Sequence, residues 1–322
     1  MSTLLRIRFA SLFAAAALLA VGGPAGSATA AAASPATAAS QDSKGYVWSG
    51  GLLRSYDVHL PAGHSSLSGL PVMLVLHGHW QTNEGMAQLT HMNRVADENG
   101  FAVVYPVSVG LGWSDSRDAT LASKLGIDDA EFMRTLVDKL TRQERADASR
   151  VYAIGMSNGG IMTQYLGCRL ADRLAGIASV TGQMPVATAP TCRPSRPLPV
   201  MLVGGTADPL IPYDGGGSGV GGKEAPVLSF ADTAAKWRAV NRCSGTRKSQ
   251  LPAAAGDPTS VTVAEATECH GRTQVKTYTV TGGGHTWPGG KQYLPTWLVG
   301  PTTSAFDASE AAWDFFESHA AG

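Results

Sequence analysis

The sequence predicts an α/β protein with a mostly parallel central sheet and helices on both faces. Short, continuous apolar runs, such as residues 71–76, 101–105 and 151–154, are typical of strands buried on both faces. Segments with helical spacing of apolar residues lie between these runs, and strands alternating with helices form covered parallel sheets. We expect further strands at 53–60, 174–180, 200–203 and 275–280, and helices at 84–99, 128–144, 161–170, 229–241 and 308–319.

Residues 1–39 are predicted to be a signal peptide and the start of a disordered N-terminus, which continues to Ser43. Arg6 and Arg8 precede an apolar run at 9–21, and Ala28-Thr29-Ala30 has the small residues of a cleavage site. The run is too short for a stable membrane span, and no nearby cysteine could carry a lipid. We expect a secreted, extracellular protein without a lipid anchor; a retained membrane anchor is the alternative.

Residues 45–320 are expected to form one domain, because this length suits a single large core. The chain has 25 basic and 25 acidic residues, and removal of the signal peptide takes away two arginines. A nearly neutral protein without a basic stripe is not expected to bind nucleic acid, or a membrane after signal cleavage. Residues 215–222 are interpreted as a flexible surface loop. Residues 242–264 are interpreted as a polar loop held in place by Cys243 and Cys269.

Four cysteines occur, all beyond the predicted signal peptide: Cys168, Cys192, Cys243 and Cys269. An even number in an exported chain favours disulfides, and three pairings are open. No two cysteines have the close spacing that zinc sites use, so we expect no metal site.

The sequence Gly155-Met156-Ser157-Asn158-Gly159 follows a β-branched apolar run and precedes a helical segment. This is the pattern of a nucleophile elbow, in which a sharp strand-to-helix turn exposes a serine hydroxyl at the edge of a sheet. Ser157 is therefore the candidate nucleophile.

A serine nucleophile needs a base and a group that orients the base, and at an elbow the order along the chain is serine, acid, histidine. His285 follows a predicted strand in a glycine-rich loop and is the candidate base, with His270 and His319 as the other downstream histidines. Asp208 directly follows a buried strand and is the candidate acid; the alternatives are Asp214 and Asp232.

An oxyanion hole needs two backbone amides aimed at the carbonyl oxygen. One is expected from Asn158, the residue after the nucleophile, and the other from His79, with Trp80 as an alternative. A competing hypothesis makes His77 and His79 a metal-binding pair, although the sequence offers no evident third ligand.

Three tryptophans fall on loops at the expected edge of the sheet: Trp80, Trp113 and Trp287. Each could be a core residue. Their clustering at one edge favours contact with an apolar or ring-bearing acyl group.

Four segments together carry a family resemblance. They are Leu76-His77-Gly78-His79, Gly155–Gly160, Gly205-Thr206-Ala207-Asp208-Pro209 and Gly284-His285-Thr286-Trp287-Pro288-Gly289. The chain, from about Tyr46 to Phe316, resembles the polyhydroxybutyrate depolymerase and feruloyl esterase family, which consists of secreted α/β-hydrolase esterases of the carbohydrate esterase family one type.

The resemblance implies an α/β-hydrolase fold and two-step ester hydrolysis by Ser157, Asp208 and His285 without a metal or cofactor. It also implies the disulfides Cys168–Cys192 and Cys243–Cys269. Many extracellular polyester depolymerases carry an additional linker and polymer-binding domain, which this chain does not show, so efficient attack on crystalline polymer is not expected.

The sequence thus predicts a secreted serine esterase. Its substrate could be a soluble ester, a feruloylated or acetylated plant polysaccharide, or an amorphous polyester. One alternative is an acyltransferase acting on cell-envelope sugars. Another is a non-catalytic secreted binding protein on a hydrolase scaffold, since a fold does not settle function.

Overall fold

Consecutive side chains of the central strands pack on opposite faces of one sheet. In β3 (Val72–Leu76), Val72, Leu74 and Leu76 belong to one apolar core, whereas Met73 and Val75 belong to the other. This alternation follows from the pleat of a strand and explains why the central strands are apolar throughout. The structure is a computed structural model that describes residues 40–218, 225–252 and 254–320, all within one compact unit.

The ten-stranded sheet has the order β1-β2-β4-β3-β5-β6-β7-β12-β11-β10. The run from β4 to β12 is parallel, and antiparallel pairs form both edges. The sheet is therefore mostly parallel through its centre, as the apolar runs predict. The other strands are β1 (Gln41–Ser49), β2 (Leu52–Leu60), β4 (Ala102–Pro106), β5 (Val151–Met156), β6 (Gly176–Val180), β7 (Val200–Gly205), β10 (Gly245–Gln250), β11 (Ser260–Thr267) and β12 (Val275–Thr281), with a separate small pair, β8 (Gly216–Gly217) and β9 (Pro226–Val227).

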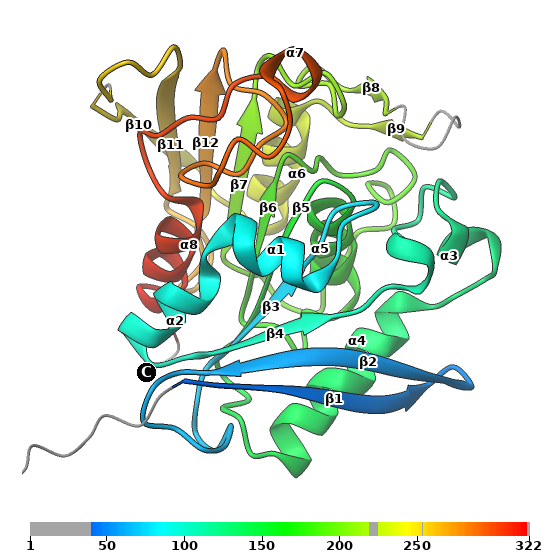
Figure 1. Cartoon of the computed structure of the whole chain (residues 1–322). Coiled ribbons are helices and arrows are strands. Elements are labelled where there is room, and N and C mark those ends of the chain that lie inside the picture. The colour runs from blue at the N-terminus through cyan, green and yellow to red at the C-terminus, as the bar shows by residue number, and fades with distance from the viewer. Residues whose placement is uncertain (1–39, 219–224, 253, 321–322) are drawn as a thin grey trace, which may run out of the picture. The chain divides into compact units, whose positions relative to one another are not determined.

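Helices cover both faces of the sheet (Figure 1). The side chains of α4 (Asp129–Asp138), α5 (Asn158–Arg169) and α6 (Phe230–Val240) build one apolar core. Those of α1 (Asn83–Thr90), α2 (Met92–Asn99) and α8 (Ala308–Glu317) build the other. Short helical segments are η1 (Val109–Leu111), α3 (Leu121–Lys124), the π-helical η2 (Lys139–Gln143) and α7 (Thr296–Val299).

Three sequence expectations are corrected by the structure. The helix expected at 84–99 is two helices, because His91 adopts a left-handed conformation with φ of 50° between them. Residues 41–43 belong to β1, so the ordered domain begins before residue 45. The polar loop expected at 242–264 contains β10 and part of β11, which extend the sheet as a hairpin. The predicted signal peptide and residues 219–222 of the 215–222 loop lie outside the described residues.

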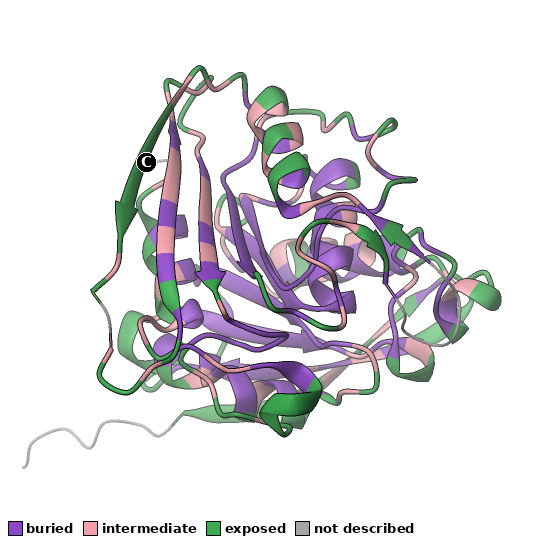
Figure 2. Cartoon of the chain, turned by 90° about the horizontal axis from the view of Figure 1, so that it is seen from above, coloured by how far each residue is buried: buried purple, intermediate pink, exposed green. Residues whose placement is uncertain are grey.

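Burial falls from the centre of the sheet to its edges (Figure 2). Every residue of β3, β4, β5, β6 and β7 is buried, whereas β10 is exposed along nearly its whole length. Among the described residues, no helix is both long and apolar enough to cross a bilayer.

Two disulfides close loops on the periphery of the domain. Cys168, near the end of α5, is bonded to Cys192, and Cys243, just after α6, is bonded to Cys269. This is the pairing that the family resemblance implies. No cysteine in the chain is left as a free thiol.

Candidate active site

Ser157 lies in a strained turn between β5 and α5. Its φ of 58° and ψ of −125° fall outside the regions that non-glycine residues favour. The turn is tight because its glycines leave no room for a side chain: a Cβ on Gly155 would lie 2.4 Å from the backbone of Gly159, and one on Gly159 would lie 2.2 Å from the Leu76 carbonyl oxygen. The geometry is that of the predicted elbow, and the strain presents the hydroxyl at the edge of the sheet.

His285 and Asp208 are hydrogen-bonded to each other below the surface. His285 Nδ1 lies 2.8 Å from Asp208 Oδ2, and both side chains are almost fully buried. A carboxylate can only accept, so in the neutral imidazole Nδ1 carries the proton and Nε2 the lone pair. The second carboxylate oxygen, Oδ1, accepts the amides of Leu210 at 2.8 Å and Ile211 at 2.9 Å, which fixes the carboxylate.

The loops that carry Asp208 and His285 follow neighbouring parallel strands, β7 and β12. Glycines allow these loops to pack closely. A Cβ on Gly205 would lie 2.4 Å from the Gly283 carbonyl oxygen, and one on Gly284 would lie 2.0 Å from the Val299 carbonyl oxygen. The glycine-rich sequence before His285 is therefore a packing requirement.

Ser157 and His285 line the same cavity, which has a volume of about 410 Å³. Among the described residues, no hydrogen bond joins the Ser157 hydroxyl to the imidazole. Such contacts are often loose in a free enzyme and shorten when substrate binds. The structure thus brings the three predicted triad residues to one site, with the serine and histidine open to the cavity.

The loop after β3 presents one unpaired amide beside Ser157. Gly78 N–H donates to Gln81 Oε1 at 2.8 Å, and Trp80 N–H donates to the Leu111 carbonyl at 2.8 Å. The His79 amide has no partner among the described residues. Trp80, the alternative donor, is thereby less suited than His79. The Asn158 amide, at the first position of α5, has no carbonyl one turn earlier in the helix to bond.

The Asn158 side chain joins the elbow to the loop after β4. Its Oδ1 accepts Trp113 N–H at 2.7 Å, and its Nδ2 donates to the Trp113 carbonyl at 3.2 Å and to Asp115 Oδ2 at 2.6 Å. Asp115 is also paired with Arg117 at 2.7 Å, and Arg117 Nη1 donates to Ser218 Oγ. This buried network fixes the backbone around the Asn158 amide.

Two of the three tryptophans expected at the substrate are core residues, which corrects that expectation. Trp113 and Trp287 have no exposed surface. The Trp113 indole donates to the His77 carbonyl at 2.8 Å, and the Trp287 indole donates to Ser309 Oγ at 3.2 Å. Through these hydrogen bonds, both buried rings stabilise loops that carry site residues. Trp80 is 67% exposed and lines the cavity of Ser157.

Sequence reasoning missed most of the apolar wall of the cavity. Apart from Met156, which precedes the nucleophile, it is formed by residues outside the triad segments, namely Leu210, Tyr293, Leu294, Leu298 and Val299. Trp297, on α7 next to Leu298, is 82% exposed. The proline- and tryptophan-containing segment after His285 carries no periodic pattern, so only its closeness to His285 in the sequence could have suggested a role. The Tyr293 hydroxyl donates to the His285 carbonyl at 2.9 Å, and burial raises its pKa to about 12.

His77 is committed to backbone contacts. Its Nδ1 donates to the Gly78 carbonyl at 2.8 Å, and Ser108 N–H donates to its Nε2 at 3.4 Å. Burial lowers the pKa of His77, so the ring is neutral. Burial lowers the pKa of His79 too, and the positive charge of Arg117 adds to the effect. Across the described ranges, no three His, Cys, Asp or Glu side chains are grouped to hold a metal ion.

Comparison with known proteins relates the chain to esterases. Residues 54–216 match the model of the family described as Esterase PHB depolymerase. The chain is 38% identical to "Putative esterase NocK" of Nocardia uniformis subsp. tsuyamanensis over 275 residues, which cover 82% of this chain and 79% of that protein. It is 28% identical to feruloyl esterase B of Piromyces equi over 251 residues, 74% of this chain but only 44% of that protein.

Among solved structures, acetyl xylan esterase from Aspergillus awamori has a TM-score of 0.56 at 14% identity, covering 86% of this chain and 99% of that one. At that identity the likeness bears on the fold alone, which is the α/β-hydrolase fold predicted from the sequence. The family match covers half of the chain, and the relative from Nocardia is similar over most of its length. The chain is therefore a member of the Esterase PHB depolymerase family, a family of ester hydrolases.

Proposed function

We propose that this protein is a secreted serine esterase in which Ser157 is the nucleophile, His285 the base and Asp208 the residue that orients the base. The observation that carries the proposal is the buried hydrogen bond between Asp208 and His285, whose imidazole lines one apolar cavity together with Ser157. The hydrogen bond fixes the tautomer in which Nε2 can accept a proton.

In the first step, Ser157 Oγ attacks the ester carbonyl carbon while His285 Nε2 takes the hydroxyl proton. The negative charge moves to the carbonyl oxygen, where the amides of His79 and Asn158 donate to it. The position of Asn158 at the start of α5 adds the positive end of the helix dipole. The intermediate then collapses: the bond to the alcohol oxygen breaks, and the alcohol leaves with the proton of His285.

In the second step, water attacks the acyl–serine ester. His285 Nε2 takes a proton from the water, the oxyanion forms again at the same two amides, and the Ser157 oxygen leaves with that proton. The acid is released and the enzyme regenerated. Asp208 stays ionised in this scheme and stabilises the imidazolium twice per cycle.

The cavity favours an apolar acyl group. Around Ser157 its wall is built from Trp80, Leu210, Leu294 and Leu298, and three of these, Trp80, Leu294 and Leu298, are also exposed to solvent. Apolar walls with few polar groups are typical of sites that bind by burial and orient by a small number of hydrogen bonds. We therefore infer a substrate whose acid is apolar or ring-bearing, such as ferulate or a short hydroxyalkanoate, and whose alcohol part extends into solvent.

Export is part of the proposal. Arg6, Arg8 and the apolar run at 9–21 have the pattern of a signal peptide. The two disulfides suit an oxidising compartment. N-terminal sequencing of the protein from the culture medium should find a start close to Ala31. Protein that stays with the cells and keeps residues 1–30 would contradict export.

The test of the activity is acid release from two substrates in parallel, feruloylated arabinoxylan and amorphous polyhydroxybutyrate, with Ser157→Ala as the blank. Ferulate release would place the enzyme with plant cell-wall esterases, and release of 3-hydroxybutyrate or its dimer with polyester depolymerases. In each case Ser157→Ala should be inactive while it keeps the melting temperature of the unmodified protein.

A serine-directed phosphonate offers a second test that needs no natural substrate. One equivalent should inactivate the enzyme, and peptide mass spectrometry should place the adduct on Ser157. Labelling of another residue, or full activity in Ser157→Ala, would contradict the assignment. Ester exchange to an added sugar in place of hydrolysis would favour the acyltransferase alternative.

A further inference from the structure

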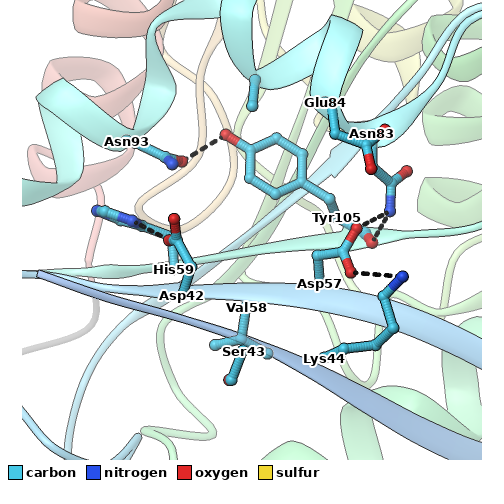
Figure 3. A pocket seen from close by; sticks show the side chains of 11 residues that line it. Asp42, Ser43, Lys44, Asp57, Val58, His59, Asn83, Glu84, Asn93 and Tyr105 are labelled. Atoms are coloured by element: carbon cyan, nitrogen blue, oxygen red, sulfur yellow. Dashed lines mark hydrogen bonds and ion pairs between the residues drawn. The ribbon is translucent and has the colours of Figure 1, made fainter.

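A second cavity lies beside the β1–β2 hairpin, and none of the triad residues lines it. It has a volume of about 410 Å³ and lies between the β1–β2 hairpin and the helices that follow β3 (Figure 3). We call it the hairpin groove. Its polar lining includes Asp42, Lys44, Asp57, Asn83, Glu84 and Tyr105. None of these residues takes part in the proposed hydrolysis.

We propose that the hairpin groove is an accessory site that binds a neutral polysaccharide chain. The inference goes beyond the proposed esterase activity and does not depend on it. It rests on three features: the polar lining held in place by internal contacts, the charge of the groove, and two exposed aromatic rings that continue its floor.

The polar groups of the groove are ordered before any ligand arrives. Asn83 Nδ2 donates to Asp57 Oδ2 at 2.9 Å and to the Tyr105 carbonyl at 2.6 Å, and Lys44 Nζ lies 3.6 Å from Asp57 Oδ1. In Figure 3 these side chains meet over the hairpin, below α1. Carboxylates, an amide and an ammonium together offer both acceptors and donors, as sugar hydroxyls require. Preorganised groups lose little conformational entropy on binding.

The charge of the groove argues against an anionic ligand. Its lining contains the carboxylates of Asp42, Asp57 and Glu84 against one lysine, Lys44, and one histidine, His59, which contacts Asp42 at 2.7 Å. With at least as many acidic as basic side chains, the groove offers no cationic surface for phosphates, nucleic acids or acidic glycans. A neutral chain of hydroxyl-bearing sugars needs no such surface and can use the carboxylates as acceptors.

Exposed aromatic rings extend the floor of the groove along β1. Side chains two residues apart in a strand share a face, so Tyr46 and Trp48 lie on the same face as Lys44. Tyr46 is 53% exposed and Trp48 is 69% exposed, and Leu53 is paired with Trp48 on β2. Same-face neighbours lie about 6.8 Å apart in a strand. Two rings at that spacing can each cover the apolar C–H face of a sugar unit, as flat amphipathic side chains do at wet interfaces.

The groove and the Ser157 cavity are neighbours in the chain. Gln81 lines the cavity of Ser157, and Asn83 lines the hairpin groove. A polysaccharide held in the groove would therefore keep its ester substituents close to Ser157. Such tethering raises the local concentration of substrate without any new contact at the reacting carbonyl.

The experiment is native affinity electrophoresis in gels that contain de-esterified arabinoxylan, which offers no ester to the triad. The unmodified protein should be retarded. The double variant Tyr46→Ala/Trp48→Ala should bind about tenfold more weakly, which corresponds to about 1.4 kcal/mol. Leu125→Ala is the matched control, because it removes an exposed apolar side chain from another segment. Its retardation should equal that of the unmodified protein.

Activity measurements distinguish a defect in the groove from a defect in the triad. The double variant should keep kcat/KM on a small soluble ester and lose about tenfold on feruloylated arabinoxylan. The proposal would be overturned by an unmodified protein that arabinoxylan does not retard. It would also be overturned by a double variant that binds arabinoxylan normally, or by one whose only loss is in binding to polyester film. Each of these results leaves the Ser157→Ala test unaffected.

Discussion

Trp113 and Asn158 exchange two hydrogen bonds in the way that neighbouring strands do. The Trp113 amide donates to the Asn158 side chain at 2.7 Å, and that side chain donates back to the Trp113 carbonyl at 3.2 Å. Through this contact the loop after β4 holds the residue whose backbone amide is the proposed oxyanion donor. In the proposed mechanism Asn158 has two roles: its amide donates to the oxyanion, and its side chain positions that amide.

Asn158→Ala should therefore lower both stability and turnover. The change leaves buried groups of Trp113 and Asp115 unsatisfied, at a cost of about 1–3 kcal/mol. We expect a fall in kcat of at least about tenfold from the displaced amide. Asn241 is a matched control, because its buried side chain makes the same two-way contact with the backbone of Leu198, outside the cavity of Ser157. Asn241→Ala should lose stability at unchanged kcat; equal losses of kcat in both variants would refute the positioning role.

Asp208→Asn tests the role of Asp208 as the residue that orients His285. The amide can still accept the backbone bonds at Oδ1, but its NH₂ group would face Nδ1 and favour the wrong imidazole tautomer. We expect kcat to fall by about 10⁴-fold, the size seen for the corresponding change in a serine protease. The melting temperature should change little. Asp214→Asn, at the exposed aspartate that was the sequence alternative, should keep full activity.

Two glycine-to-alanine changes should have opposite effects on the free energy of unfolding. Gly159→Ala would place Cβ 2.2 Å from a backbone oxygen of β3, so the elbow could not close without moving the sheet. Gly85→Ala lies within α1 with its nearest contact at 3.4 Å, and alanine favours a helix over glycine by roughly 0.5–1 kcal/mol. Denaturant titration should show Gly85→Ala stabilised and Gly159→Ala strongly destabilised or unfolded. A stable, active Gly159→Ala would contradict the elbow geometry.

His77 should make stability depend on pH. Burial keeps its folded pKa below the ordinary value of 6.5, so the unfolded chain binds more protons just below pH 6.5. The free energy of unfolding should then rise with pH through this interval. The contribution is fully present above pH 6.5 and is lost as pH falls toward the lowered folded pKa. Urea titrations between pH 5 and 8 should show a flatter dependence for His77→Gln, and the slope of the unmodified protein for His64→Gln at an exposed position.

Each disulfide should contribute on the order of 3 kcal/mol in the chain-entropy model, since the loops span 24 and 26 residues. The double variant Cys168→Ala/Cys192→Ala should therefore melt several degrees lower, and mild reduction of the unmodified protein should have a comparable effect. Titration of free thiols in untreated secreted protein is the direct check. A count of four thiols would show that neither bond forms in solution.

The centre of the fold could be predicted because burial on both faces leaves a local signature. The apolar runs at 72–76 and 151–156 are strands for this reason. The outermost strands of the sheet could not be predicted, because β1 and β10 are exposed and mostly polar. Only their pairing with β2 and β11 makes them strands. Likewise, the break at His91 depends on one residue adopting φ of 50°, which no periodicity reveals.

The residues of the site also differ in how well the sequence predicts them. Ser157, Asp208 and His285 could be located because each follows a strand within a glycine-rich motif. The tryptophans could not be sorted into core and surface, since Trp80, Trp113 and Trp287 all lie on loops and differ only in what packs over them. The exposed Trp48 and Trp297 lie outside any motif, and only the structure shows that Trp48 is on a paired edge strand and that Trp297 is next to a residue of the Ser157 cavity.

The pairing of β7 with β12 also sets the order in which the site becomes complete. The His79 loop and Ser157 follow β3 and β5 in the first half of the chain, whereas His285 follows β12, the last strand of the sheet. Because domains form from the N-terminus as synthesis proceeds, a nascent chain holds the proposed nucleophile long before it holds the proposed base. In the proposed mechanism, a chain that is still being made therefore has no active serine. The site becomes complete only when β12 pairs with β7.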